Sequence, residues 1–369
     1  MTVGLLKEPA YETRVSLLAE SVAALTKKGI RVLVEAGAGE KAFCHDEEYI
    51  SAGAGIAGRN EIIQSAEIIL SIHLPLQEEL NQLNQKVIIG VYQPLYHAEI
   101  VKQWAASRIT SFSLDMLPRT TRAQAMDVLS SQANIAGYKA VLTAANAYGR
   151  YFPMFMTAAG SIAPAKMLIL GAGVAGLQAI ATSRRLGAVV EVFDTRPAVK
   201  EEVMSLGAKF IEVEGAADAS KAGGYAVEQS EDFMQRQKAK IAESAAKADI
   251  IITTAQIPGK KAPILITEEM ISSMRNGSVI VDLAAATGGN TPLTKNNERV
   301  VHNGVTIIGN SSLQSTMPSD ASKLYGKNVL NFLQLIITKE AALQLNWEDD
   351  LVKGSCITHD GQIIHERVK

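Results

Sequence analysis

The stretch KMLILGAGVAGLQAIATSRRLGAVVEVFDTR, residues 166–196, decides the fold of this chain. It begins as an apolar strand, turns through Gly171, Gly173 and Gly176, continues as a helix, and returns to a strand that ends at Asp194. This order is typical of a βαβ unit that binds a dinucleotide. The first glycine permits a tight turn, the second lets a pyrophosphate approach the backbone, and the third lets helix and strand pack closely. The phosphates are expected at the helix amino terminus, whose N–H groups attract anions.

Asp194 follows the third glycine by eighteen residues, the spacing at which a carboxylate binds the adenosine ribose hydroxyls. Such a carboxylate repels a 2′-phosphate, so the pattern favours NAD(H) over NADP(H). Arg196 weakens this preference, because an arginine near this position accommodates a 2′-phosphate. A glycine-rich turn that binds nothing is the alternative, and the agreement of strand, helix and acidic residue disfavours it.

Continuous runs of Val, Ile and Leu, separated by amphipathic helical patterns such as SLLAESVAALTKKG and HAEIVKQWAAS, predict parallel strands covered on both faces. A long helix is expected over residues 123–148, and Asp360-Gly361 predicts a hairpin turn. The tail after residue 320 is too short to fold alone. We therefore expect an α/β fold with two Rossmann-like, doubly wound domains separated by a cleft, residues 1–128 with 321–369 and residues 129–320. The predicted strands are TVGLL, IRVLVEA, AEIILSIHL, KVIIGVY, RITSFSL, KFIEV, DIIITTA, SVIVDLA and VTIIGN.

Composition excludes several classes of function. The 369 residues are 47% hydrophobic and 20% charged, with a formal net charge of −2, so nothing favours nucleic acid or anionic lipid as the ligand. The two cysteines, Cys44 and Cys356, lack the spacing of metal ligands, and we expect free thiols and no metal site. The sequence shows no signal peptide and no membrane-spanning run. We therefore expect any work at a membrane to depend on partner subunits.

The run RTTRAQAMDVLSSQ, residues 119–132, has the apolar rhythm of a helix but carries many polar groups. Gln124, Asp127 and Ser130 recur every third residue, which places them on one side of a helical turn. One interpretation is a solvated helix face. The other is a set of hydrogen-bonding groups directed at a ligand.

A family resemblance favours the second interpretation. The runs RAQAMDVLSSQANIAGYKAV, MTAAGSIAPAKMLILGAGVAGLQAIATSRRLGAVVEVFDTR, TTAQIPGKKAPILIT and VDLAAATGGN together resemble the NAD(H)-binding component, domain I, of proton-translocating nicotinamide nucleotide transhydrogenases. The resemblance covers nearly the whole chain, which is similar to the form of domain I that is a separate alpha subunit.

The resemblance implies direct, Si–Re (AB-specific) hydride transfer between NADH on this chain and NADP⁺ on an NADP(H)-binding partner. Membrane-spanning subunits would couple the transfer to proton translocation. The chain would be a homodimer, inactive without its partners, and held by them on the cytoplasmic face of the inner membrane. Direct hydride transfer requires no acid or base, so the protein has to place the nicotinamide ring.

The resemblance also assigns roles to residues. Asp127 and Ser130 would hold the carboxamide, Arg119 would reach the pyrophosphate or ribose, and Gln124 would face the partner's nicotinamide. A mobile loop, residues 214–233, would close on the nucleotide through its tyrosine; Gln229 stands where family members often carry methionine. The implied cofactor-binding residues are Gly171, Gly173, Val174, Gly176, Asp194, Thr195, Arg196, Gly224, Tyr225, Ala255 and Gln256.

Two alternatives remain open at this point. Alanine dehydrogenases share the two-domain plan and the KEP…RV signature, but their lysine, histidine and aspartate positions hold His73, Tyr92 and Ala286 here. These departures argue against amino-acid oxidation, and a histidine at a strand end such as His73 is expected to be a packing residue. A non-catalytic NAD(H)-sensing module is the second alternative. It has no need of an exposed nicotinamide face, so the presence of the arginine, glutamine and aspartate of residues 119–127 together favours catalysis.

Overall fold

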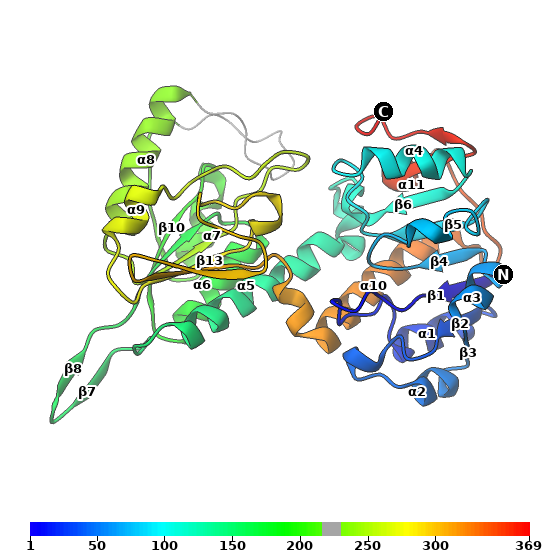
Figure 1. The fold of residues 1–369 in the computed structure, drawn as a ribbon, viewed down its shortest axis with the longest axis horizontal. Helices are drawn as coiled ribbons and strands as arrows, with labels where there is room; N and C mark the ends of the chain where they lie inside the picture. The colour runs from blue at the N-terminus through cyan, green and yellow to red at the C-terminus, as the bar shows by residue number, and fades with distance from the viewer. Residues whose placement is uncertain (216–229) are drawn as a thin grey trace. The chain divides into compact units, whose positions relative to one another are not determined.

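The computed structural model describes residues 1–215 and 230–369. The chain forms two compact units, residues 1–132 with 315–369 and residues 133–314. The boundaries predicted from the sequence lie after residues 128 and 320. Each unit is built on a mostly parallel sheet with helices packed on it (Figure 1). The predicted fold class, two α/β domains with parallel sheets, is confirmed.

The first unit contains an eight-stranded sheet whose order, β17-β16-β6-β5-β4-β1-β2-β3, includes the doubly wound Rossmann order of its first six strands. The C-terminal segment completes this sheet, because β16 pairs antiparallel with β6. Asp360 and Gly361 both have positive φ, 44° and 80°, as the predicted hairpin turn between β16 and β17 requires. The strands are β1 (Thr2–Leu5), β2 (Arg31–Glu35), β3 (Gly55–Ala57), β4 (Ile68–Leu70), β5 (Val87–Gly90), β6 (Thr110–Ser113), β16 (Cys356–His359) and β17 (Gln362–Ile363).

Helices cover both faces of this sheet, and its central strands β4, β5 and β6 are fully buried, whereas the edge strands β3 and β17 are partly exposed. Phe112 and Phe332 pack in the larger core cluster, and Trp104 and Tyr92 meet edge to face in the smaller one. The helices are α1 (Ala19–Thr26), α2 (Asp46–Ser51), α3 (Arg59–Ser65), α4 (Ala98–Ala106), α10 (Pro318–Ile336) and α11 (Asp350–Ser355).

The second unit repeats the doubly wound order in a seven-stranded sheet, β11-β10-β9-β12-β13-β15-β14. Alternate residues of β12 enter different cores: Ile250 and Ile252 join one cluster and Ile251 the other. The strands are β9 (Lys166–Leu170), β10 (Val189–Phe193), β11 (Lys209–Phe210), β12 (Ile250–Thr253), β13 (Val279–Asp282), β14 (Glu298–His302) and β15 (Val305–Gly309). The helices are α6 (Val174–Arg185), α7 (Lys200–Ser205), α8 (Glu231–Ala245) and α9 (Glu268–Ser273), and α5 (Val128–Ala147) enters from the first unit.

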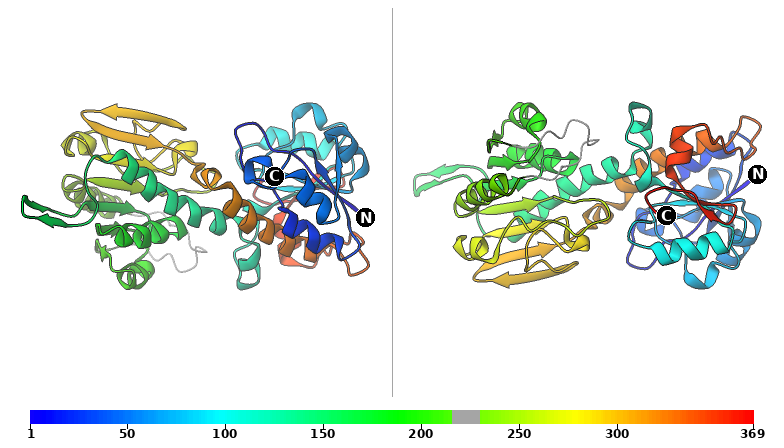
Figure 2. Two further views of the ribbon diagram at one scale, coloured as in Figure 1. Left: turned by 90° about the horizontal axis from the view of Figure 1, so that it is seen from below. Right: turned by 90° about the horizontal axis from the view of Figure 1, so that it is seen from above.

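Three details differ from the sequence prediction. The long helix begins at Val128 rather than residue 123, because residues Thr121–Met126 form the separate 3₁₀ helix η4. The short strand β3 and the antiparallel edge strand β14 were not predicted, since neither has a long apolar run. A two-stranded hairpin, β7 (Phe155–Thr157) and β8 (Gly160–Ile162), was also missed, and it extends away from the sheet of its own unit (Figures 1 and 2).

No helix of residues 1–215 and 230–369 has the length and apolar character needed to cross a membrane.

Candidate nucleotide-binding site

The glycine turn lies between the end of β9 and the start of α6, as predicted. Gly171 has φ 103°, a conformation that L side chains rarely adopt. A Cβ on Gly176 would stand 1.9 Å from the carbonyl oxygen of Gly171, so only glycine permits this approach of helix and strand. A Cβ on Gly173 would meet no heavy atom of the described residues within 4 Å. The folded chain thus requires glycine at positions 171 and 176. Gly173 borders open space at the start of α6, whose first residue is Val174.

The Asp194 carboxylate, at the end of β10, is already engaged by protein groups. The backbone N–H of Ala172 donates to Oδ2 at 2.7 Å, which ties this carboxylate to the glycine turn. Arg196 donates from its backbone N–H and its Nε to Oδ1, at 2.8 and 2.9 Å, and from Nη2 to Oδ2 at 2.8 Å. The side-chain hydrogen bonds that Arg196 donates to Asp194 raise the pKa of Arg196, and Thr195 lies half-buried between the two residues. A ribose hydroxyl would therefore compete with Arg196 for this carboxylate.

The segment after β12 lies directly beside the glycine turn. Thr254 donates from its backbone N–H to the carbonyl of Leu170 at 2.9 Å, and its Oγ1 lies 3.3 Å from the carbonyl of Gly171. Ala255 and Gln256 follow, and Gln256 Nε2 donates to the carbonyl of Leu283 at 3.1 Å. The structure thus brings the predicted residues of the glycine turn, of the 194–196 segment and of the 255–256 segment to the carboxyl edge of one sheet.

Residues 119–130 belong to the first unit. Asp127 caps α5: its Oδ1 accepts the backbone N–H of Ser130 at 2.9 Å, and its Oδ2 accepts the Ser130 hydroxyl at 2.6 Å. Gln124 lies in η4 instead, so the prediction that Gln124, Asp127 and Ser130 share one side of a helical turn is wrong. Arg119 precedes η4, and Arg122 forms a two-pronged ion pair with Asp349.

Gly224, Tyr225 and Gln229 lie outside the described residues.

The 255–256 segment depends on two residues that sequence reasoning missed. Asp282 and Asn290 are fully buried, and both hold the loop that follows β13. For Asp282 a signal was present, since a polar residue that ends an apolar strand, as in SVIVDLA, often organises the loop after it. For Asn290 the sequence carries no such signal.

Two of the three positions compared with alanine dehydrogenase, His73 and Tyr92, lie in a polar network of the first unit. His73 Nε2 is 2.7 Å from Glu12 Oε2, and Glu12 forms a buried ion pair with Arg14. His73 thus makes a hydrogen bond to a buried carboxylate, which the packing role expected from the sequence does not include. Tyr92 is buried, with its hydroxyl 3.1 Å from Ser71 Oγ. The backbone N–H of Ala286, the third position, belongs to the second unit and donates to Ser311 Oγ at 2.7 Å.

Glu8 adds a titrating group to this network. Its carboxylate accepts the backbone N–H groups of Ile72, at 2.5 Å, and His73, at 3.1 Å. Burial raises the pKa of Glu8 to about 7, against the lowering effect of these hydrogen bonds.

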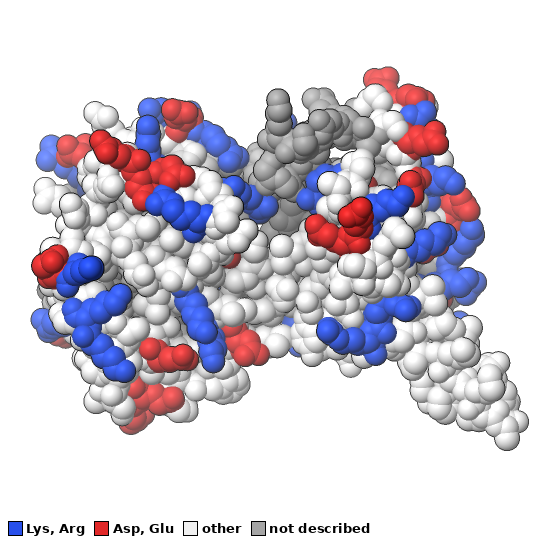
Figure 3. All heavy atoms as spheres, turned by 180° about the vertical axis from the view of Figure 1, so that it is seen from behind, with Lys and Arg blue, Asp and Glu red and all other residues white. Residues whose placement is uncertain are grey.

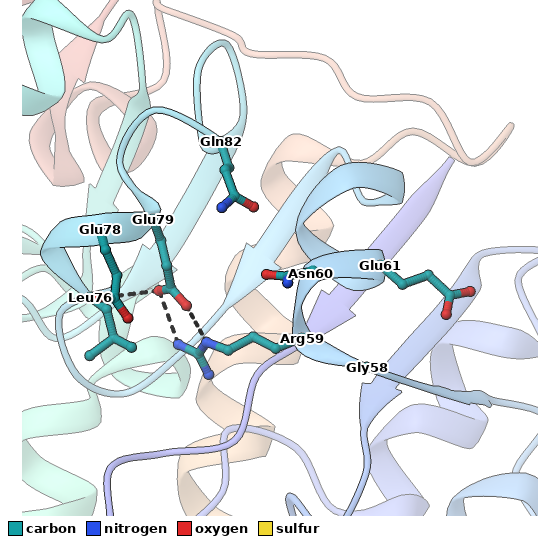
Figure 4. A pocket seen from close by; sticks show the side chains of 8 residues that line it. All are labelled: Gly58, Arg59, Asn60, Glu61, Leu76, Glu78, Glu79 and Gln82. Atoms are coloured by element: carbon teal, nitrogen blue, oxygen red, sulfur yellow. Dashed lines mark hydrogen bonds and ion pairs between the residues drawn. The ribbon is translucent and has the colours of Figure 1, made fainter.

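A surface pocket of the first unit contains none of the predicted site residues (Figure 4). Its central cation, Arg59, is paired with Glu79 and with Glu35, the latter at 2.9 Å. Within residues 1–215 and 230–369, no cluster of His, Cys, Asp and Glu could hold a metal ion. Acidic and basic side chains are interspersed on the face drawn in Figure 3. Because its arginine is already paired and it contains no predicted site residue, the pocket is not a second candidate for the nucleotide-binding site. It is lined by Gly58, Arg59, Asn60, Glu61, Leu76, Glu78, Glu79 and Gln82.

Comparison with known proteins identifies the family of this chain. Residues 4–136 match the model of the alanine dehydrogenase/PNT N-terminal domain, and residues 140–366 match that of the C-terminal domain. An NAD(P) transhydrogenase alpha-subunit polypeptide of Rhodospirillum rubrum is 44% identical over 364 residues, 96% of this chain and 95% of that protein. An alanine dehydrogenase of Staphylococcus haemolyticus is 25% identical over 378 residues, covering 100% of this chain and 95% of that protein.

Among solved structures, the transhydrogenase from Sinorhizobium meliloti superposes with a TM-score of 0.90 at 44% identity. The match covers 99% of this chain and 100% of that one. Both family domains are matched in order, and the similarity extends nearly from end to end. The chain therefore belongs to the alanine dehydrogenase/PNT family and is similar throughout to NAD(P) transhydrogenase alpha subunits.

Proposed function

We propose that this chain is the NAD(H)-binding alpha subunit of a proton-translocating NAD(P) transhydrogenase. NADH bound in the second unit gives its hydride directly to NADP⁺ on a partner subunit, and membrane-spanning subunits couple the transfer to proton movement. The observation that carries the proposal is the glycine turn, where Gly173 borders open space at the start of α6. The end-to-end similarity to transhydrogenase alpha subunits supports the reaction class.

The residues of the second unit would bind the dinucleotide rather than react with it. The amino terminus of α6 attracts the pyrophosphate, and Arg184 and Arg185 in the last turn complement the other end of the helix dipole. Asp194 would accept a ribose hydroxyl in exchange for a bond from Arg196. Val174, Thr195, Ala255 and Gln256 border the same edge of the sheet, and Gly224 and Tyr225 are proposed as further contacts by family resemblance.

In the first unit, we propose that Arg119, Gln124, Asp127 and Ser130 place the nicotinamide ring. Asp127 and Ser130 already bond to each other, which fixes both side chains in one geometry. A carboxamide offers two N–H donors and one carbonyl acceptor. It can therefore bond to the acceptor positions of Asp127 that remain and to the Ser130 hydroxyl. Placement of this kind is what direct hydride transfer requires of the protein.

The hairpin β7–β8 supports the proposal of a homodimer. It exposes Met154, Phe155 and Met156, the last at 72% of its surface, and carries no charged residue over 151–164. An isolated two-stranded hairpin is marginal in water, and an exposed apolar surface of this kind marks an interaction site. We propose a second copy of the chain as its partner, with the assembly held on the cytoplasmic face of the inner membrane by the membrane-spanning subunits.

Two measurements test the function. Calorimetric titration should show NADH binding more tightly than NADPH, and tighter binding of NADPH would overturn the assignment of the nucleotide. The chain mixed with the NADP(H)-binding subunit of a transhydrogenase should transfer hydride from NADPH to an oxidised NAD analogue of shifted absorbance, and neither protein should do so alone. NADH formation from NAD⁺ and L-alanine by the chain alone would support the alanine dehydrogenase alternative.

A further inference from the structure

The loop of residues 254–263, between β12 and α9, forms one side of the carboxyl edge where the glycine turn lies. Its two ends are joined by one side chain from another part of the unit. Asn290 Nδ2 donates to the carbonyl of Ala255 at 2.9 Å and to the carbonyl of Pro263 at 2.8 Å. Its Oδ1 accepts the backbone N–H of Ala255 at 3.2 Å. A single amide therefore closes this loop at its base.

Asn290 is itself held in place by groups beneath it. It is fully buried, and its backbone N–H donates to Asp282 Oδ2 at 2.6 Å. Asp282 also accepts the backbone N–H of Ala284 at 2.9 Å and the hydroxyl of Thr294 at 2.7 Å. The buried carboxylate at the end of β13 thus fixes the backbone from which the Asn290 side chain reaches across to the neighbouring loop.

A carboxylate, a hydroxyl or an apolar side chain at position 290 would not supply the same bonds. A carboxylate at position 290 would place an oxygen against the carbonyl oxygens of Ala255 and Pro263, and a serine would be too short to reach both. An apolar residue would leave the three backbone groups that bond to Asn290 without this partner, which is unfavourable. The neutral amide, with two donors and one acceptor, matches this loop base.

We propose that Asn290 is a positioning residue for dinucleotide binding. It fixes Ala255 and Gln256, which directly follow Thr254 at the carbonyl of Gly171, and acts on the ligand only through them. The inference rests on the proposed function, in which the second unit binds NADH. Gln256 Nε2 adds a second tie between the same two loops through the carbonyl of Leu283.

The test compares NADH binding by the natural protein, by Asn290→Asp and by a control, Asn303→Asp, at an exposed asparagine of the β14–β15 turn. At pH 8 we expect Asn290→Asp to bind NADH roughly tenfold more weakly or worse, because a charged carboxylate faces two carbonyl oxygens. Burial raises the pKa of such a carboxyl group. Protonation at pH 6 restores one donor, so affinity should recover severalfold relative to the natural protein and the control at the same pH.

Hydrogen exchange gives an independent measurement. Peptides that cover residues 250–266 should exchange faster in Asn290→Asp at pH 8 than in either other protein. If Asn290→Asp does not fold, Asn290→Ser takes its place, and weaker NADH binding with faster exchange of the same peptides is expected.

Three results would overturn the inference. One is a folded variant that binds NADH as tightly as the natural protein at pH 8, and the second is weak binding that does not recover at pH 6. The third is unchanged exchange over residues 250–266. A natural protein that binds no NADH would overturn the proposed function, and this inference with it.

Discussion

The buried ion pair between Glu12 and Arg14 should make the stability of the first unit sensitive to the loss of either partner. Arg14 donates from Nε to Glu12 Oε1 at 2.9 Å and from Nη2 to Oε2 at 2.7 Å. Its remaining terminal nitrogen donates to Gln132 Oε1 at 2.8 Å. Both charged side chains are almost inaccessible to water. The substitution Arg14→Met keeps the length of the side chain and removes all three bonds.

The expected magnitude follows from what remains. Without the Arg14 side chain, the buried Glu12 carboxylate keeps the backbone N–H groups of Thr13 and of residue 14 and its contact with the partly exposed His73, but it loses the guanidinium charge. Removing one partner of a buried pair costs about 3–5 kcal/mol, because the other charge is left uncompensated. We therefore expect Arg14→Met to lower the free energy of unfolding of the first unit by about 3–5 kcal/mol at pH 7.5.

The effect should depend on pH. Burial raises the pKa of Glu12, but the hydrogen bonds from Arg14 and His73 outweigh it and hold that pKa well below its usual range. A lowered pKa contributes stability that is present above the unfolded value of about 4.3 and is lost as the pH falls. Without Arg14 this contribution is largely absent. The difference between the natural protein and Arg14→Met should therefore be full at pH 7.5 and shrink as the pH falls below about 4.3.

Tryptophan fluorescence in urea provides the measurement, since Trp104 and Trp347, the two tryptophans of the chain, both belong to the first unit. The control is a double-mutant cycle with Glu12→Gln. The double variant is expected to be clearly more stable than the sum of the single effects, because it leaves no buried charge of the pair. A loss below about 1 kcal/mol for Arg14→Met at pH 7.5, or strictly additive effects, would refute this reasoning.

Three further predictions concern single positions. Burial raises the pKa of Glu8 to about 7, so the contribution of the protonated Glu8 to stability is full below about pH 4.3 and is lost as the pH rises through 7. Glu8→Gln lacks this titration. The free energy of unfolding of Glu8→Gln minus that of the natural protein should therefore increase by about 3 kcal/mol between pH 4.5 and 8.5. In Gly176→Ala, whose Cβ would lie 1.9 Å from a carbonyl oxygen, NADH affinity in a titration should fall at least roughly tenfold while tryptophan-detected unfolding is unchanged. Met156→Asp should convert a dimer to monomers in sedimentation experiments, whereas the same change at the exposed Val301 should not.

Much of the fold could be predicted because its signals are local. The turn at residues 171–176 needs glycine at two positions for steric reasons that involve neighbours a few residues away. Strand β12 is buried on both faces, so its sequence is a continuous isoleucine run. The hairpin β7–β8 carries no such signal, since its exposed strands have no buried face to impose a pattern. The start of α5 differs from the prediction because Asp127 caps the helix, a role that the polar pattern of residues 119–132 does not reveal.

The site could be predicted only in part, because its remaining members depend on contacts distant in sequence. Asn290 bonds to Ala255, 35 residues earlier, and no periodicity in either segment indicates this pairing. Arg14 likewise bonds to Gln132 across 118 residues of sequence. The nucleotide-binding turn is encoded within about thirty residues, whereas the groups that hold its surroundings meet only in the folded chain.

The acidic groups assigned to the ligand bond to the protein in this structure. Asp194 is paired with Arg196, and Asp127 with Ser130. At Asp194, binding would exchange one protein hydrogen bond for one ligand hydrogen bond, so this contact would add little to the net affinity while still fixing the orientation of the ligand. At Asp127, the bond to Ser130 would hold the carboxylate in a fixed orientation for the ligand. A subunit that must release oxidised nucleotide after each hydride transfer gains from this arrangement, because orientation raises the rate of the chemical step and tight ground-state binding does not. The pre-paired acids therefore agree better with a turnover enzyme than with a sensor built for high affinity.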